Sequence, residues 1–176
     1  QEERYTRIKH DQSFPINAIK ACLENESISI NDVDFITYYE RPKAKFIRLI
    51  KTYLSEAPMG YKSFIRAMRL WLNEKLWIKK IIKKKLKYKG KIYFVNHHES
   101  HAASAFYPSP FKSAAIIVMD GVGEYDTTSL WETKSNKIEK ICSIKFPHSL
   151  GLLYSAFTYY TGFKVNSGEY KLMGLA

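Results

Sequence analysis

The spacing of apolar residues predicts mainly helices in the first half of the chain and a mixture of strands and helices in the second. In three early segments apolar side chains recur every three to four positions, the period of a helix with one buried face. These segments are residues 13–25, 43–56 and 61–87. Ser13, ahead of Phe14-Pro15, is expected to begin the first helix. Residues 34–40, rich in aromatic side chains, predict a strand.

The pattern changes after residue 90, where short apolar runs alternate with helical segments. In chain order we expect a strand, a short helix, a second strand, the two strands of a hairpin and a final helix, at residues 91–95, 99–106, 114–119, 127–133, 138–146 and 150–160. The run at 114–119 is apolar enough to be buried on both faces. Ser149 can cap the last helix and Gly162 can end it. This alternation favours an α/β layer fold.

Composition indicates a folded protein with a substantial core. Of 176 residues, 45% are hydrophobic and 15% aromatic, which excludes a disordered chain. Cys22 and Cys142 form neither a disulfide framework nor a CxxC metal site, and no apolar run reaches the roughly 18 residues of a membrane span. We therefore expect a cytoplasmic protein. Because the sequence runs from Gln1 to Ala176 without an initiating Met or a polar tail, we interpret it as a fragment.

The net charge of +11 comes from one segment. Residues 61–91 contain twelve Lys or Arg and a single acid, Glu74, while the rest of the chain is balanced. A basic helix interleaved with aromatic residues can bind nucleic acid or an anionic membrane surface. The alternative, which we favour, is a solvated outer face with its apolar stripe turned inward, so nucleic acid is not an expected partner.

Three histidines lie close together after the strand at 91–95. His97 and His101 are four residues apart and face the same way if the segment is helical. Asp120 follows the strand at 114–119. Two imidazoles and a carboxylate suit iron, zinc or manganese with coordination positions left open. The alternative is that the histidines make ordinary hydrogen bonds, a role that suits His98 best because it points away from the other two.

A glycine-rich turn, Gly121-Val122-Gly123-Glu124, follows this aspartate. Glycines there allow the backbone to approach a phosphate with its amides directed at the oxygens. A turn that leads into the hairpin explains the same residues. The hydroxyls that follow can be phosphate donors or simply strand residues: Thr127, Thr128 and Ser129. The helix that opens at Ser149-Leu150-Gly151 could hold an anion, or Ser149 could be a plain N-cap.

Four stretches of the sequence carry a resemblance to a known family. They are residues 2–11 (EERYTRIKHD), 96–109 (NHHESHAASAFYPS), 146–154 (FPHSLGLLY) and 161–176 (TGFKVNSGEYKLMGLA). In this order they resemble the N-terminal half of the carbamoyltransferases of nodulation-factor and antibiotic biosynthesis. Residues 41–91 contain no such motif, so the resemblance there is one of position.

The resemblance implies a fold and a reaction. Members of that family move a carbamoyl group from carbamoyl phosphate to a hydroxyl of a sugar or natural product, with ATP and a carbamoyl-adenylate intermediate. It implies a partial actin-like ATPase (RNase H-like) fold, a mixed sheet with flanking helices, shared with threonylcarbamoyl transferases that act on tRNA. It also implies that a metal, reported as iron, is bound by the positions of His97, His101 and Asp120.

Several further residues suit this chemistry by type. His10 and His98 are candidates for the base that activates the acceptor hydroxyl. Lys9 and Lys171 are candidate contacts of phosphate or carbamoyl groups, as are the amides of Gly121 and Gly123. The expected partners are therefore ATP, carbamoyl phosphate and a small hydroxylated acceptor, and homodimerisation is left open.

The resemblance also predicts what the chain lacks. Residues 1–176 correspond to part of the N-terminal carbamoyl-transfer domain, and the family's first strand and its C-terminal adenylating domain are expected outside them. We therefore expect that residues 1–176 alone do not turn over carbamoyl phosphate. Two alternatives are kept: a threonylcarbamoyl-type transferase that contacts tRNA through the Lys-rich helix, and a non-catalytic module that uses this helix on nucleic acid or a membrane.

Overall fold

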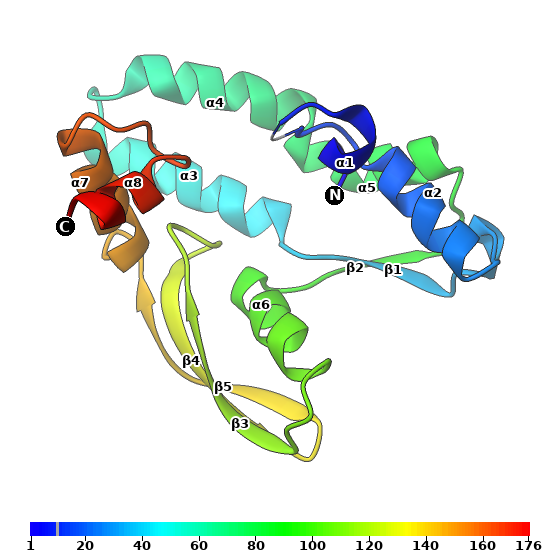
Figure 1. Cartoon of the computed structure of the whole chain (residues 1–176). Coiled ribbons are helices and arrows are strands. Elements are labelled where there is room, and N and C mark those ends of the chain that lie inside the picture. The colour runs from blue at the N-terminus through cyan, green and yellow to red at the C-terminus, as the bar shows by residue number, and fades with distance from the viewer. Residues whose placement is uncertain (10) are drawn as a thin grey trace. The chain divides into compact units, whose positions relative to one another are not determined.

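The computed structural model describes residues 1–9 and 11–176, and the chain forms two compact units. Unit 1 comprises Gln1–Tyr38 and Ala57–Tyr93, and unit 2 comprises Tyr39–Glu56 and Phe94–Ala176. Figure 1 shows the course of the chain through both. His10, a candidate base, lies outside the described residues.

Unit 1 is mainly helical. Its elements, in chain order, are α1 (Glu3–Thr6), α2 (Ile16–Asn25), the 3₁₀ turn η1 (Ile30–Asp32), β1 (Phe35–Tyr38), α4 (Tyr61–Asn73), the 3₁₀ turn η2 (Lys75–Trp77), α5 (Ile78–Leu86) and β2 (Lys91–Phe94), whose last residue belongs to unit 2. Strands β1 and β2 pair in a two-stranded sheet. The buried Tyr88 hydroxyl lies 3.1 Å and 3.0 Å from the carbonyls of Val33 and Asp34, which ties the approach to β1 to that of β2.

The start of α2 is capped from a distant part of the chain. Ser13 does not cap it, contrary to the sequence prediction, and the helix begins three residues later at Ile16. The buried Glu2 carboxylate instead accepts hydrogen bonds from the amides of Asn17 (3.2 Å) and Ala18 (3.0 Å). These are among the first amides of a helix, which have no partner within it. Burial disfavours the charged carboxylate, but the hydrogen bonds from Ala18 and Asn17 outweigh it and lower the pKa of Glu2.

Replacing Glu2 by Gln is expected to flatten the dependence of stability on pH. Because the folded-state pKa of Glu2 lies below its ordinary value of 4.5, the stabilisation it adds is complete above that value and is lost as pH falls through the folded-state pKa. Melting temperatures of the two proteins should therefore differ most near neutral pH and converge below about pH 4.5. A difference that stays constant with pH would contradict this.

The Lys-rich segment is not one helix from 61 to 87, as its spacing suggested. Helix α4 ends at Asn73, and η2 separates it from α5. At the break the Trp77 indole N–H donates to the Leu72 carbonyl (2.7 Å), one of the groups that the end of a helix leaves without an intrahelical partner. The lysines of α5 are exposed and Ile82 is buried, so the lysines face outward and the apolar side inward. This exposure agrees with a solvated face and with a binding face alike.

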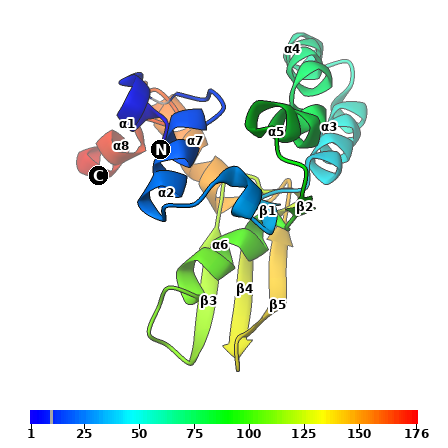
Figure 2. The ribbon, with the colours of Figure 1, turned by 90° about the vertical axis from the view of Figure 1, so that its right-hand side faces the viewer.

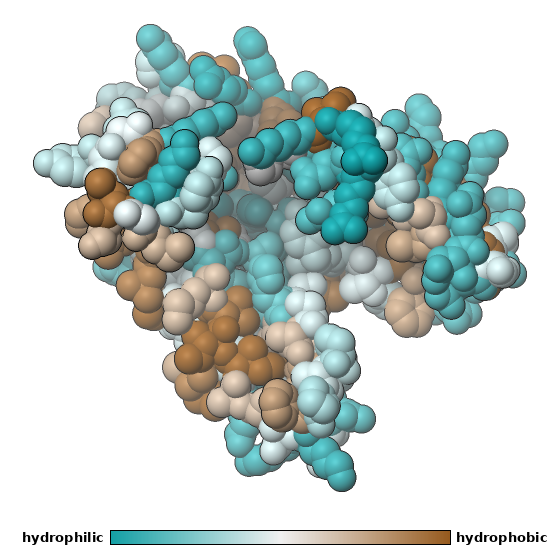
Figure 3. Space-filling view, viewed as in Figure 1, coloured by the Kyte–Doolittle hydropathy of each residue, from teal (hydrophilic) through white to brown (hydrophobic). Residues whose placement is uncertain are grey.

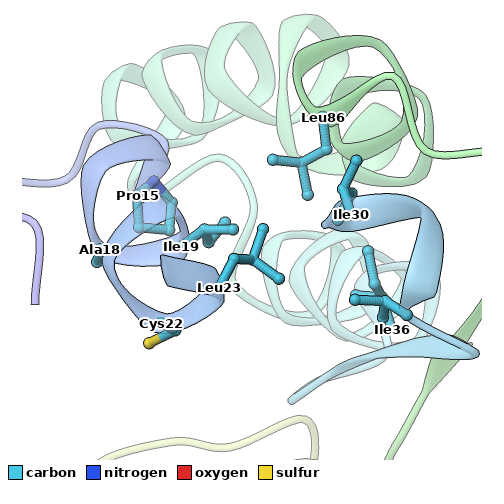
Figure 4. Close-up of a pocket in the computed structure, with 9 residues that line it drawn as sticks. Pro15, Ala18, Ile19, Cys22, Leu23, Ile30, Ile36 and Leu86 are labelled. Atoms are coloured by element: carbon cyan, nitrogen blue, oxygen red, sulfur yellow. The ribbon is translucent and has the colours of Figure 1, made fainter. Parts of the chain in front are cut away.

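An apolar pocket of about 320 Å³ lies within unit 1, between α2, η1, β1 and α5. Figure 4 shows its lining side chains, all hydrophobic in character: Pro15, Ala18, Ile19, Cys22, Leu23, Ile30, Val33, Ile36 and Leu86. No charged or hydrogen-bonding side chain lines it, so it offers little with which to orient a polar substrate.

Unit 2 is built on a three-stranded antiparallel sheet of order β3-β4-β5. Its elements are α3 (Pro42–Glu56), α6 (His97–Phe106), β3 (Ser113–Met119), β4 (Asp126–Lys134), β5 (Lys137–Lys145), α7 (Leu150–Tyr160) and α8 (Glu169–Leu175). The predicted hairpin is confirmed: Ser135 and Asn136 form a two-residue turn, both with positive φ (49° and 65°), the geometry whose twist matches paired strands.

Helix α6 packs against this sheet, as Figure 2 shows. The contact centres on Ala102, Val118 and Trp131, which form the buried core of the unit with Ile116 and Ile138 beside them. Ala102 is completely buried, because a small side chain allows the helix to lie close to the strands.

Strand β3 is less buried than its sequence suggested. Only Val118 is buried, while Ile117 and Met119 are 61% and 62% exposed, so the prediction of a strand covered on both faces is wrong for this structure. Strand β3 lies at the edge of the sheet. Helix α6 covers the face that carries Val118, and the opposite face, which carries Ile117 and Met119, is exposed. Hydrophobic side chains are visible over the sheet and α7 in Figure 3.

The α/β class predicted from the sequence is confirmed. The strands, however, form two sheets rather than one mixed sheet, and the actin-like fold remains a prediction. Among the described residues no helix is both long and apolar enough to cross a membrane.

Candidate metal centre

His97 and His101 are placed by the cap of α6. The Asn96 side chain accepts hydrogen bonds from the amides of His98 (3.1 Å) and Glu99 (3.3 Å), so the helix begins at His97, two residues before the predicted start. This makes His97 and His101 neighbours one turn apart, with ring centroids separated by 4.8 Å. The predicted common face of the two histidines is therefore confirmed.

Asp120 is placed by the end of β3 and by the start of α7. Its amide donates to the Thr127 carbonyl (2.8 Å), which closes the loop between β3 and β4. Ser149 donates from Oγ to the Gly121 carbonyl (2.7 Å) and accepts from the Leu152 amide (3.0 Å). Ser149 is thus a plain N-cap, as one of the two interpretations held, and it also fastens the Asp120 loop to α7.

Three side-chain donor atoms converge between α6 and this loop. His97 Nε2 lies 2.7 Å from Asp120 Oδ2 and 3.2 Å from His101 Nε2, and the donor atoms of the group all lie within 4.8 Å of one another. A metal with bonds of about 2.0–2.2 Å separates neighbouring ligand atoms by about 3.0–3.6 Å. The 3.2 Å between the two histidine nitrogens lies in this range, whereas the 2.7 Å between His97 and Asp120 is a hydrogen-bond distance that a bound ion would have to widen. The three residues are thus a candidate set for one divalent ion, and His101 is exposed, which leaves access for a further ligand.

The charge state of the group also suits a cation. The hydrogen bond from His97 lowers the pKa of Asp120 to about 2, so this carboxyl is ionised at neutral pH. No thiolate contributes to the group, and imidazole with carboxylate favours iron, zinc or manganese.

His98 points away from this group, as expected. It is 1% exposed, and its Nδ1 lies 2.6 Å from Ser129 Oγ, which also accepts from the Trp131 indole (2.7 Å). Burial lowers the pKa of His98 and keeps it neutral. A Cβ at Gly123 would lie 3.0 Å from the His98 ring, so the glycine allows the loop to pack on the imidazole.

Two of the three hydroxyl residues named at the start of β4 act as strand residues. Thr127 is fully buried and its hydroxyl lies 2.5 Å from the His148 carbonyl, while Ser129 is occupied by His98 and Trp131. Neither has a hydroxyl open to a phosphate. Thr128 Oγ1 is buried without a hydrogen-bond partner among the described residues, so for Thr128 both interpretations, phosphate donor and strand residue, stay open.

The two candidate lysines lie in different units. Lys9 is exposed in unit 1, and Lys171 is exposed on α8 in unit 2. The structure places neither of them in the three-residue group that could hold a metal.

Two buried carboxylates next to the group were missed from the sequence. Glu40 and Glu124 are each 3% exposed. Glu124 accepts from the Arg41 amide (2.6 Å) and forms an ion pair with its guanidinium (2.9 Å), and Glu40 lies 3.8 Å from His97 Nδ1. Position alone offered one signal for Glu40, because it is the last residue of the strand predicted at 34–40, and polar side chains at strand ends can meet at one edge of a sheet.

Comparison with known families settles the relationship of the chain. The family described as carbamoyltransferase N-terminus matches residues 1–176, which is the whole sequence. The chain belongs to this family. The resemblance found in the sequence motifs is therefore confirmed.

Individual relatives agree with this assignment. The chain is 58% identical to uncharacterized protein sll1178 of Synechocystis and 31% identical to nodulation protein NolNO of Sinorhizobium fredii, over its full length in each case. It is 28% identical to uncharacterized protein MJ1058 of Methanocaldococcus jannaschii over 99% of its length. The chain spans 30%, 25% and 37% of these three relatives, so it matches between a quarter and just over a third of their length.

Proposed function

We propose that the carbamoyltransferase domain described here is part of an O-carbamoyltransferase. The complete enzyme would move a carbamoyl group from carbamoyl phosphate, through carbamoyl-adenylate, to a hydroxyl of a sugar or natural product. Family membership supports a carbamoyl transfer, and one relative is named a nodulation protein. The observation that carries the site is the convergence of His97, His101 and Asp120.

In this proposal the three residues hold a divalent metal, with iron as the expected ion. A bound divalent ion would polarise a phosphate or carbonyl oxygen of the intermediate. Asp120 contributes a charge that persists at neutral pH, and the exposed edge at His101 admits the ligand. The cap at Asn96 and the clamp at Ser149 hold these ligands in place, so little rearrangement is needed when the ion binds.

The base that accepts the hydroxyl proton is proposed to be His10 or His98. His98 is buried under the loop at Gly123, so it could reach an acceptor only after that loop moved. Its neutral, hydrogen-bonded ring equally supports the loop that carries Asp120. His10 therefore has priority as the residue to substitute first.

Contacts with ATP are proposed for Lys9, Lys171 and the amides of Gly121 and Gly123. Each is of a suitable type for phosphate oxygens. The proposed protein is cytoplasmic, with small molecules as its partners and an actin-like domain fold. The exposed lysines of α5 keep one alternative, transfer to tRNA, for which steeply salt-dependent tRNA binding would be the evidence.

The proposal is tested with the full-length protein, ATP and carbamoyl phosphate labelled at the carbamoyl carbon. We expect ATP-dependent transfer of label to members of a panel of sugars and hydroxylated natural products, and loss of at least about 100-fold in kcat/KM for Asp120→Asn. The Asp126→Asn protein is the control, because Asp126 pairs with Lys140 and lies outside the metal group. Label found only on tRNA would replace the proposed acceptor class, and no labelled product with any acceptor would contradict the transfer.

A further inference from the structure

We infer that Glu40 is a positioning residue for the proposed metal centre. Its carboxylate faces Nδ1 of His97, the ring nitrogen that points away from Asp120 and His101, and so fixes the orientation of the imidazole. The inference rests on the proposed metal site and deepens it. Glu40 Oε2 lies 3.8 Å from His97 Nδ1, and that nitrogen is buried without a hydrogen-bond partner among the described residues. A buried ring nitrogen with no partner is costly. The Glu40 carboxylate that faces Nδ1 is placed to accept a hydrogen bond from it whenever Nδ1 carries the ring proton.

The two nitrogens of His97 face opposite groups. Nε2 faces Asp120 and His101, while Nδ1 faces Glu40. The nitrogens lie on opposite sides of the imidazole, so Glu40 does not belong to the ligand set that surrounds Nε2. It is instead where an acceptor for a metal-bound histidine is usually found, since such a histidine donates its other N–H to a carboxylate, a carbonyl or water.

The backbone around Glu40 is held next to α6 by a second carboxylate. Glu124 binds the amide and guanidinium of Arg41, the residue that follows Glu40. The same carboxylate lies 3.5 Å from the side-chain nitrogen Nδ2 of Asn96, the residue before His97. Glu124 thus joins the neighbour of Glu40 to the neighbour of His97, and the ring of Tyr39 packs on His97 at 5.6 Å between centroids.

The separation of 3.8 Å is longer than a hydrogen bond, which spans about 2.7–3.2 Å between heavy atoms. If a metal took Nε2, the proton that Nε2 shares with Asp120 in this structure would have to leave it, and the neutral ring would carry its proton on Nδ1, where Glu40 could accept it. We therefore expect the carboxylate to close on Nδ1 when the ion is bound. The nearly complete burial of Glu40 strengthens this interaction because little water competes for the carboxylate.

A purely structural role for Glu40 is the competing explanation. Lys45 Nζ, on α3, lies 2.8 Å from the same Oε2, and in this explanation Glu40 serves only to fasten the start of that helix. The two explanations predict different effects of the Lys45→Met substitution on metal affinity. If Glu40 serves His97, the Lys45→Met protein keeps its metal affinity or gains some, because a competing cation is gone. If Glu40 serves Lys45, both substitutions have the same effect.

The experiment compares Glu40→Gln, Lys45→Met and Asp126→Asn with the wild type, all as full-length proteins. Affinity for Co²⁺ is measured by competition with a chelator, and the visible absorption of the bound ion reports its ligand field. We expect Kd to rise about 10- to 100-fold in Glu40→Gln with a shifted absorption band, and to stay level or fall in Lys45→Met. Asp126→Asn breaks another ion pair of the same unit, between the buried Asp126 and the exposed Lys140 (2.8 Å), and should bind Co²⁺ like the wild type.

The possible results test the metal site and the role of Glu40 separately. If the wild type binds Co²⁺ and Glu40→Gln binds it equally well with an unchanged spectrum, the role of Glu40 is refuted while the metal site stands. An equal loss in Lys45→Met and Glu40→Gln also refutes it, in favour of the ion pair. A wild type that binds no metal overturns the metal site and this inference together. Should Glu40→Gln fail to fold, Glu40→Asp is used instead. Its shorter side chain keeps the negative charge but holds it farther from His97 Nδ1, so an intermediate loss of Co²⁺ affinity is expected.

Discussion

Replacing both His97 and His101 by alanine is expected to remove the metal from the full-length protein. Two of the three converging donors are lost, and a lone carboxylate binds a divalent ion too weakly to survive purification. Metal content after anaerobic purification should fall from about one ion per chain to a background level. Elemental analysis by mass spectrometry measures this and identifies the ion at the same time.

The matched control for this substitution is His148→Ala. His148 is an exposed histidine of the same unit that does not belong to the three-residue group, so its loss should leave the metal content unchanged. Thermal melts of both variants show whether the fold is retained. If the double variant folds and holds as much metal as the wild type, His97 and His101 are not ligands.

Replacing Gly151 by alanine is expected to disrupt the Asp120 loop. A Cβ at this position would lie 2.8 Å from the Asp120 carbonyl oxygen and 2.9 Å from the Gly121 Cα. Both are backbone atoms, and the clamp at Ser149 prevents α7 from simply moving away. We expect a loss of about 1–3 kcal/mol in stability, as for overpacked sites, together with weaker metal binding because Asp120 is displaced.

Gly174→Ala is the matched control. Gly174 also lies in a helix, α8, but a Cβ there meets no atom within 4 Å. Alanine favours helix over glycine by about 1 kcal/mol, so this variant should be as stable as the wild type or slightly more so. Melting temperature and Co²⁺ affinity are measured for both. Unchanged values for Gly151→Ala would show that α7 does not position Asp120.

The three proposed metal ligands were accessible from the sequence because their arrangement is local. His97 and His101 share one helix, so their common face follows from the helical period. Asp120 was found because it ends an apolar strand. The supporting carboxylates could not be found in this way. Glu40 precedes His97 by 57 residues, and Glu124, although it lies in the same turn as Asp120, bonds to Arg41 and Asn96, which are 83 and 28 residues away along the chain.

The same distinction explains the errors in the predicted elements. The hairpin turn and the cap at Ser149 depend on neighbouring residues and were correct. The start of α2 depends on Glu2, a distant residue, and was misplaced. Apolar spacing continued through the break between α4 and α5, and so gave no sign of it.

Local sequence was sufficient for the type of most elements, the hairpin and the pair of histidines, because periodicity and turn chemistry act between near neighbours. Tertiary structure alone decided which groups stand behind these residues. It placed Glu40 at the back of His97, buried His98 under Gly123 and left β3 exposed on one side. The reason is physical: hydrogen bonds between distant segments and the burial of a strand depend on which surfaces meet, and no short stretch of sequence contains that information.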